Sequence, residues 1–253
     1  MRLVVTSTAG NAVDYAARCI RSVSNQRTDY DRRGEGRRVG HWYSSSDEAT
    51  HLEAIATARE SSADCECTLD PGLSPLERLI PMWLELDAAD VVIWLDGDDE
   101  LAEGAIERVA RFHELDDVWL TYGSFVRDDG QIDYQVSPVF GRRYRMPPRS
   151  SSFRATHLRT FRAGLFHELC ERGGIREHLR DDAGELFKAA PDVAVMVALL
   201  ELAGERYFVA TDVLCRYNYA HAAKGVDAVH RQRMDVEQLG RRRPLERLEE
   251  RPW

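Results

Sequence analysis

The sequence predicts an α/β fold in which helices sandwich a mostly parallel sheet. Stretches with the apolar spacing of amphipathic helices alternate with short apolar runs along residues 1–220, an order that is typical of parallel strands joined by crossover helices. One of these runs, at residues 91–95, contains only Val, Ile, Trp and Leu, as expected for a strand buried on both faces. Asp96, Asp98 and Asp99 follow it, at the end of the strand where open α/β sheets bind ligands.

The composition indicates a globular protein of one large domain, or of one domain and a tail. The chain has 253 residues, 43% hydrophobic and 30% charged, enough to bury a full core. Its formal net charge of −9 argues against general attraction to nucleic acid. No apolar run approaches the ~18 residues of a membrane span, and residues 1–10 resemble a strand rather than a signal peptide, so we expect no integral membrane association. The five cysteines are scattered and odd in number, which favours a cytoplasmic location over a disulfide framework or a zinc site.

The first half of the chain is expected to alternate strands and helices. Short apolar runs predict strands at residues 2–6, 39–43 and 65–69. Apolar spacing predicts helices at 13–23 and 76–86, the second with an internal Pro81. The Ser and Asp residues at 44–47 are N-cap types and predict a third helix at 48–59. The very polar segment 27–38 is expected to be an exposed loop.

The second half continues the pattern beyond the central strand. Helices are expected at 102–115 and 192–203, the latter ended by Gly204, and residues 156–169 also have helical spacing. Strands are expected at 118–125, 207–210 and 214–218, with a hairpin turn at Asp129-Gly130. We therefore expect one domain over residues 1–220, followed by a charged helix or mobile tail over 221–253.

The carboxylates after the central strand are the first candidate site. Asp96 and Asp98, two residues apart at a strand end, can hold one hard divalent cation through oxygen atoms, and such a cation would neutralise a diphosphate. The alternative is a solvated acidic turn with no ligand, because short motifs of this kind also occur by chance.

Four separated pieces of the chain together resemble the family 2 glycosyltransferases of the GT-A fold. Residues 11–15 and 22–26 resemble the family's N-x-x-x-Y and S-V-x-x-Q opening, and residues 95–99, LDGDD, resemble its L-D-x-D-D metal motif. Asp192 opens a helix where the family has an E-D pair, and residues 205–218 resemble the strand and Y-N ending that follow. The resemblance covers residues 1–220 and implies a Rossmann-like nucleotide-sugar fold, with a donor half at 1–101 and an acceptor half at 102–220.

The resemblance implies a metal-dependent transferase that uses a nucleotide sugar, with UDP as the expected nucleotide and Mn or Mg as the metal. Asp98 is the implied direct ligand, Asp96 lies nearer the ribose or a metal-bound water, and His221 is a third candidate ligand or a simple surface histidine. Asp192 is the implied general base of an inverting reaction, or alternatively an ordinary N-cap. The residues expected on the donor side are Thr6, Ser7, Thr8, Asp47 and Arg78. For Thr6, Ser7 and Thr8 the alternative is a simple turn.

Two positions depart from the family pattern. The family has D-D-x-S-x-D after the second strand, whereas this chain has YSSSDE at residues 43–48, so the acid that helps to bind the nucleotide is missing there. Asp47 or Glu48 would substitute for it, or Tyr43 would stack on the base. Pro191 also replaces the Glu of the E-D pair, while Asp192 is retained.

An arginine-rich segment, residues 142–162, is the clearest feature outside these motifs. It holds seven arginines, one histidine and no acid, and residues 157–162 resemble a stretch of some bacterial and phage members of the family. We expect an acceptor-side loop with Arg154, His157 and Arg159 near the acceptor, because guanidinium groups suit phosphates and carboxylates. A solvated face enriched by the chain's general arginine bias is the alternative.

Several functions are consistent with these features. The acceptor is a glycan, a protein side chain or a modified base in DNA, and the last would use the arginine-rich segment. A nucleotidyltransferase also needs paired acids at a strand end, but the chain has no glycine-rich phosphate loop for it. A degenerate GT-A module that binds a sugar or a partner without catalysis is the alternative from a different class.

Overall fold

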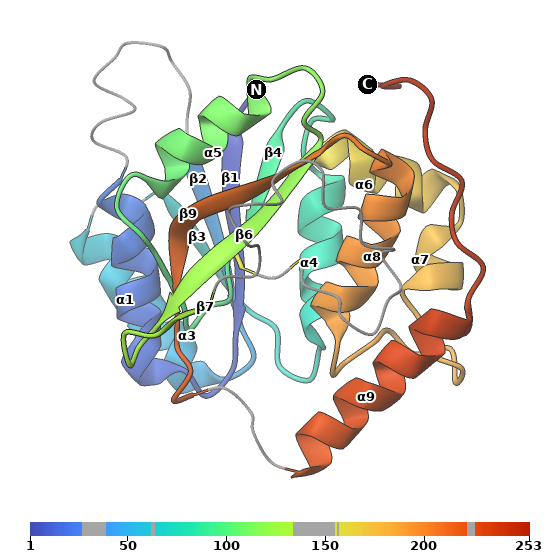
Figure 1. Ribbon diagram of the computed structural model, residues 1–253. Coiled ribbons are helices and arrows are strands. Elements are labelled where there is room, and N and C mark those ends of the chain that lie inside the picture. The colour runs from blue at the N-terminus through green and yellow to red at the C-terminus, as the bar shows by residue number, and fades with distance from the viewer. Residues whose placement is uncertain (27–38, 62–63, 134–154, 156, 222–225) are drawn as a thin grey trace.

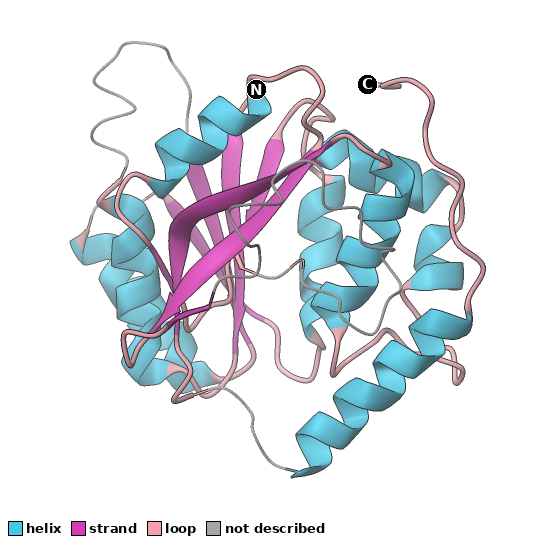
Figure 2. Cartoon of the chain, in the orientation of Figure 1, coloured by secondary structure: helices cyan, strands magenta, loops and turns pink. Residues whose placement is uncertain are grey.

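A nine-stranded sheet with helices on both sides forms the centre of the molecule (Figures 1 and 2). The computed structural model describes residues 1–26, 39–61, 64–133, 155, 157–221 and 226–253. Within them the strands are β1 (Leu3–Ala9), β2 (Val39–Ser45), β3 (Cys65–Leu69), β4 (Val91–Trp94), β5 (Glu100–Leu101), β6 (Leu120–Arg127), β7 (Ile132–Asp133), β8 (Arg159–Arg162) and β9 (Tyr207–Tyr217). The helices are α1 (Val13–Ser24), α3 (Glu48–Glu60), α4 (Pro75–Leu84), α5 (Ala105–His113), α6 (Ala163–Glu171), α7 (Gly174–His178), α8 (Pro191–Ala203) and α9 (Val226–Arg241).

The sheet combines a parallel half and a mixed half, in the strand order β3-β2-β1-β4-β8-β6-β9-β5, with β7 beside β6. Strands β3, β2, β1 and β4 are all parallel, whereas β8 is antiparallel to both β4 and β6. The predicted α/β class is thus confirmed. The expected strand positions of the first half are correct within a few residues, and the polar segment 27–38 lies outside the described residues.

Helices cover both faces of the sheet with their apolar sides. In β4, Val92 and Trp94 pack into the core beneath α4, α6 and α8, while Val91 and Ile93 pack into the core beneath α1 and α5. Figure 1 shows these two groups of helices on opposite sides of the sheet. A strand in this position has no solvent face, which explains why its sequence is a continuous apolar run rather than an alternating one.

Two expectations for the second half were wrong. Residues 156–169 do not form one helix, because the buried residues Arg159–Arg162 form strand β8 between β4 and β6, and α6 begins only at Ala163. The strands expected at 207–210 and 214–218 are a single strand, β9, whose pairing with β6 is interrupted by a shift of register between Gly123 and Phe125. In both cases pairing across the sheet overrides the local pattern.

The helix ends agree with the capping residues in the sequence. The side chain of Asp47 accepts a hydrogen bond from Thr50 N at the start of α3. Ser74 and Glu77 form a capping box at α4, which continues through Pro81. Helix α8 ends at Gly204, which has a φ of 61°.

The C-terminal residues pack against the rest of the fold. Helix α9 is largely exposed but buries Leu239. Beyond it, Leu248 N donates to Leu202 O of α8 at 2.8 Å, and the Trp253 ring lies 5.1 Å from the Trp119 ring. Among the described residues, no helix has the length and apolarity needed to cross a membrane.

Candidate active site

The turn after β4 places three carboxylates at the carboxyl end of the parallel strands. Leu95 N donates to Thr6 O at 3.1 Å and Gly97 N donates to Thr8 O at 3.0 Å, which fixes the turn against β1. A Cβ atom on Gly97 would lie 2.7 Å from the Cβ atom of Ala9 and 2.9 Å from Thr8 O. Only glycine therefore allows the backbone to approach β1 this closely.

Asp96 is held by two side chains at the start of β8, those of His157 and Arg159. His157 Nε2 lies 3.1 Å from Asp96 Oδ2, and Arg159 Nη1 lies 3.4 Å from both carboxylate oxygens. Burial alone would raise the pKa of Asp96, but Arg159 and His157 outweigh it and hold this pKa well below its usual range. Asp96 is therefore a stable anion at neutral pH.

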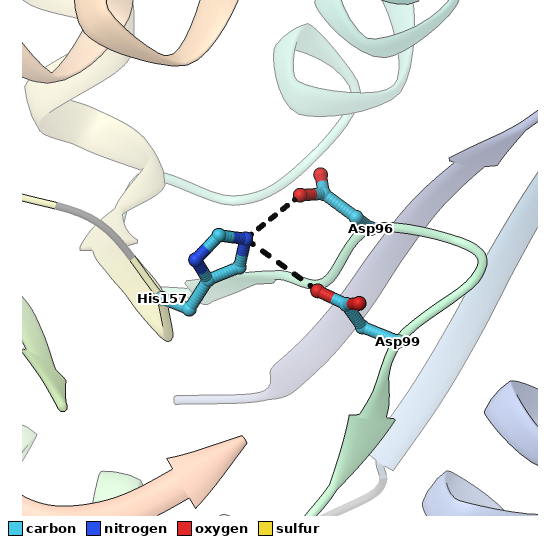
Figure 3. Close-up of side chains that lie close together, drawn as sticks. All are labelled: Asp96, Asp99 and His157. Atoms are coloured by element: carbon cyan, nitrogen blue, oxygen red, sulfur yellow. Dashed lines mark hydrogen bonds and ion pairs between the residues drawn. The ribbon is translucent and has the colours of Figure 1, made fainter. Parts of the chain in front are cut away.

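Asp99 is the buried member of the carboxylate group. It is 0% exposed, accepts a hydrogen bond from Asn218 N at 2.8 Å and lies 3.5 Å from His157 Nε2. Burial, and then the charges of Asp96 and Asp98, raise its pKa well above the usual value. One atom each of Asp96, Asp99 and His157 lie within 4.8 Å of one another, close enough to share an ion, and Figure 3 shows the histidine pointing its Nε2 between the two carboxylates.

Asp98 faces a histidine from the far end of the chain. His221 Nδ1 lies 2.7 Å from Asp98 Oδ2, and His221 Nε2 donates to Asn11 O at 3.1 Å. Burial and Asp96 raise the pKa of Asp98, against the lowering effect of His221. Both side chains remain about one-quarter exposed, at 25% and 29%. The fold thus joins two predicted metal ligands that are 123 residues apart.

Asp192 lies on the same site, joined to Asp96 by a shared arginine. Arg159 Nη2 donates to Asp192 Oδ2 at 2.9 Å, and the guanidinium also lies over the Trp94 ring at 4.9 Å. Burial would lower the pKa of Arg159, but the three carboxylates of Asp96, Asp192 and Asp99 outweigh it and raise that pKa. Arg159 is 3% exposed and Asp192 is 22% exposed, so the aspartate is open to a ligand while its partner is not.

The alternative role of Asp192 as an N-cap is wrong. The N-cap residue of α8 is Ala190, which offers no side-chain bond, and Asp192 lies in the first turn of the helix. Asp235 of α9 caps the helix instead, since its Oδ2 accepts hydrogen bonds from Ala189 N and Ala190 N, both at 3.0 Å. The carboxylate of Asp192 is consequently directed at Arg159 rather than at the helix end.

The expected acceptor residues take internal positions. His157 and Arg159 contact the carboxylates described above, and Arg162 donates to Ala89 O and His113 O. All three are at least nine-tenths buried, so this part of the arginine-rich segment is not the expected loop, while the acceptor role of His157 and Arg159 stays a prediction. Arg154 lies outside the described residues.

The residues expected on the donor side fall into two groups. Thr6 and Ser7 are fully buried, Thr6 accepting from Trp83 Nε1 and Ser7 paired with His41 Nε2, each at 3.0 Å. Their side chains therefore support the strand and do not reach a ligand. Thr8 is only partly buried, and Asp47 Oδ2 accepts from Asn11 N at 2.7 Å in addition to capping α3.

The side chains of Arg78 and Asp70 lie at the carboxyl ends of β1, β2 and β3. Asp70 was not indicated by the sequence patterns. Arg78 Nη1 donates to Ala9 O at 3.0 Å and Ser44 O at 2.9 Å, which ties the ends of β1 and β2 together. Asp70, just past β3, accepts from Ser44 Oγ at 2.8 Å and Thr68 Oγ1 at 2.6 Å. The available signal for Asp70 was its place between a strand and the Pro-Gly turn, at the sheet edge where the other acids lie.

A cavity of about 240 Å³ opens beside this pair. It is lined by residues of β2, β3, α4 and the turn between them: Trp42, Glu66, Thr68, Asp70, Leu73, Glu77, Arg78, Pro81, Met82 and Glu85. Tyr43, which was expected as an alternative stacking residue, is 0% exposed and donates to Gly97 O at 2.8 Å. It therefore supports the carboxylate turn and is not available to stack on a base.

Comparison with known proteins supports the fold assignment. No protein-family model and no curated protein sequence matches the chain. The structure of residues 1–349 of S. aureus TarS with UDP-GlcNAc aligns over 97% of this chain and 68% of that one, with a TM-score of 0.64 and 11% identity. A longer TarS structure aligns with a TM-score of 0.61 and 12% identity over 86% of this chain, which spans only 37% of that protein.

A second type of neighbour is the mannosyltransferase PcManGT from Pyrobaculum calidifontis, solved with GDP-Man and Mn²⁺. It aligns with a TM-score of 0.56 and 15% identity over 94% of this chain and 62% of that one. At such identities the likeness is evidence of fold. The chain has the GT-A-like fold of these glycosyltransferases, as the sequence resemblance implied.

Proposed function

We propose that the protein is a glycosyltransferase that moves a sugar from a nucleotide-sugar donor to an acceptor hydroxyl, with inversion. The main support for this proposal is the position of Arg159 between two carboxylates. Arg159 joins Asp96 of the D-x-D turn to Asp192 of α8, at 3.4 and 2.9 Å, at the sheet edge where a GT-A-like fold binds ligands. A structural ion pair alone would not need a second carboxylate that is open to solvent.

The residues proposed to hold a divalent cation such as Mn²⁺ or Mg²⁺ are Asp98, Asp96 and His221. Asp98, Asp96 and His221 are 25%, 33% and 29% exposed, and they offer carboxylate oxygens and an imidazole nitrogen, the ligands such ions take. Asp99 is fully buried and bonded to Asn218 N, so we place the ion on the exposed side of the turn rather than between Asp96, Asp99 and His157. When bound, the metal would supply Lewis-acid stabilisation of the leaving diphosphate.

Asp192 is the proposed general base. The acceptor oxygen attacks the anomeric carbon of the donor, the bond from that carbon to the diphosphate oxygen breaks, and the acceptor proton passes to a carboxylate oxygen of Asp192. The products are an inverted glycoside and a nucleoside diphosphate, and the base contributes about 10²–10⁴-fold in rate. Arg159 Nη2 donates to Asp192 Oδ2 at 2.9 Å and so fixes the position of this carboxylate before the reaction.

The nucleotide base is assigned to the cavity beside Arg78 and Asp70. Asp70 replaces the acid that the family carries after the second strand, and accepts an N–H of the base as uracil or guanine provides. Asp70 follows β3, which lies three strands from β4 in the sheet. At about 4.8 Å per strand the ends of β3 and β4 are separated by roughly 14 Å, which an extended nucleoside diphosphate and the side chains at its two ends span together. The UDP-GlcNAc bound by TarS and the GDP-Man bound by PcManGT support a donor of this class, and UDP is the first choice.

Turnover across a donor panel tests the proposal. The purified protein is mixed with UDP-, GDP- and TDP-sugars, with and without Mn²⁺, and release of the nucleoside diphosphate is measured together with donor binding. We expect one donor to be bound and slowly hydrolysed. D98A should lose both activities, and D192N should lose turnover but retain binding. A folded wild-type sample that binds the donor without any turnover would support the non-catalytic module instead, and one that binds no donor would refute both.

A further inference from the structure

The N-terminus of α8 is capped by a side chain from a helix near the C-terminus. Asp235 Oδ2 accepts hydrogen bonds from Ala189 N and Ala190 N at 3.0 Å, across 46 and 45 residues of sequence. Neither Ala190 nor Pro191, at the helix start, provides a capping side chain. Without Asp235 the helix end would therefore lack its side-chain hydrogen-bond acceptor.

Asp192 carries a carboxylate that could replace this cap. It lies in the first turn of α8, two residues from Ala190, whose N–H group would lose its acceptor without Asp235. A carboxylate drawn to those groups would leave Arg159 Nη2, which it now contacts at 2.9 Å. The cap from Asp235 removes that competing position for the side chain of Asp192.

Helix α9 is itself held in place on the C-terminal side of Asp235. Gln238 Oε1 accepts a hydrogen bond from Asp182 N at 2.9 Å, and Leu239 is 3% exposed in the core beneath α8. Arg242 donates to Glu177 O and pairs with Asp182 at 3.5 Å. The carboxylate of Asp235 is thus presented by a helix whose following residues are bound to the rest of the fold, as a positioning contact requires.

We propose that Asp235 is a positioning residue for the general base, and that helix α9 exists in part to direct the carboxylate of Asp192 toward the reacting acceptor. The role in catalysis rests on the proposed function, whereas the competition between Asp235 and Asp192 for the helix end does not. Asp235 acts through the helix end and touches no substrate, so its removal should lower kcat while the affinity for the donor is unchanged. A displacement of about 1 Å at a catalytic group costs on the order of 10²-fold in rate.

The kinetic test compares D235A and D235N with the control E237Q, a change on the exposed face of the same helix, where Glu237 is 62% exposed and pairs with Arg241 at 3.9 Å. D235A should lose roughly 10- to 100-fold in kcat with the donor Kd retained. D235N should recover most of kcat, because its amide oxygen still accepts both N–H groups, and E237Q should match the wild type. A loss in D235A that appears in the donor Kd alone, or that D235N does not recover, would overturn the proposal.

A stability cycle tests the same inference without any turnover, and so separates its failure from that of the proposed function. Unfolding in urea is measured for the wild type, D235A, D192A and the double variant. If Asp192 takes over the cap when Asp235 is removed, D192A should lower the folding constant by about threefold or more in the D235A background beyond its effect in the wild type. Additive effects would contradict the proposal. If D235A does not fold, D235E, which keeps the carboxylate but displaces it by one methylene, serves in the same cycle.

Discussion

Replacing Arg159 by Met should lower the stability of the protein, and the geometry of the site gives the expected size of this effect. The guanidinium is 3% exposed and lies 3.4 Å from Asp96 and 2.9 Å from Asp192. Methionine retains much of the apolar stem but removes all five donors, so two carboxylates face one another across the space that the cation filled. The variant should therefore be destabilised by charge rather than by loss of volume.

The magnitude follows from how much solvent reaches the two carboxylates. Removing one partner of a fully buried ion pair costs about 3–5 kcal/mol. Asp96 and Asp192 are 33% and 22% exposed, so water compensates in part and we expect the lower end, about 3 kcal/mol. For a chain of this size that lowers Tm by roughly 6–12 °C.

Urea unfolding of four proteins measures the effect and its cause: the wild type, R159M, D192N and the double variant. D192N removes one of the two repelling charges, so the double variant should be more stable than the sum of the single effects by about 1–3 kcal/mol. R172M is the matched control, because Arg172 pairs with Glu168 at 3.2 Å but is 42% exposed, and it should change stability by less than about 0.5 kcal/mol. A loss below about 1 kcal/mol in R159M, or strict additivity with D192N, would refute the electrostatic account of the site.

Three further predictions concern the metal, pH and the carboxylate turn. Mn²⁺ at about 100 times its Kd should stabilise the protein by about 2.7 kcal/mol and raise Tm by roughly 5–10 °C, and D98A should abolish the shift in a thermal melt; an equal shift in D98A would contradict the assignment. Burial lowers the pKa of His41 to about 3, so the folded state stays neutral while the unfolded state gains a proton below pH ~6.5. Stability should therefore fall as the pH drops from about 6.5 toward 3, by up to about 1.4 kcal/mol per pH unit for this group, and urea midpoints of H41Q should fall less steeply than those of the wild type; identical slopes would refute this. G97A should cost about 1–3 kcal/mol and lose nucleotide binding, whereas G40A, whose added Cβ meets nothing within 4 Å, should retain binding; a G97A variant that binds normally would show that the close approach to β1 is not required.

Most of the first half of the fold was predictable from the sequence because its signals are local. The β4 run is apolar on both faces, the caps at Asp47 and Ser74 mark helix starts, and the parallel order follows from the crossover helices. Strand β8 was not predictable in the same way. Its four residues, RTFR, have an arginine at each end and no alternation of apolar and polar side chains, and they form a strand only because β4 and β6 pair with them from both sides.

The candidate site shows the same limit. The D-x-D turn and Asp192 carry local motifs, and His221 was a candidate metal ligand whose hydrogen bond to Asp98 only the structure shows. The inward position of Arg159 was not anticipated, because an arginine-rich segment in an acidic chain is most simply interpreted as a surface. Burial of that guanidinium becomes favourable only when carboxylates from two distant segments meet it, which spacing along the chain does not reveal. Asp70 and Asp235 were missed for the same reason, since each acts on backbone or side chains of another element.

Titration calorimetry of the protein with UDP and UDP-sugars, with and without Mn²⁺, tests whether the carboxylate turn binds the donor diphosphate through a metal. We expect binding that requires the metal in the wild type, survives in D192N and is lost in D98A, because the proposed turn site holds the ion while Asp192 acts only on the acceptor. Binding that persists in D98A, or that is independent of the metal, would contradict the assignment of the diphosphate site to this turn.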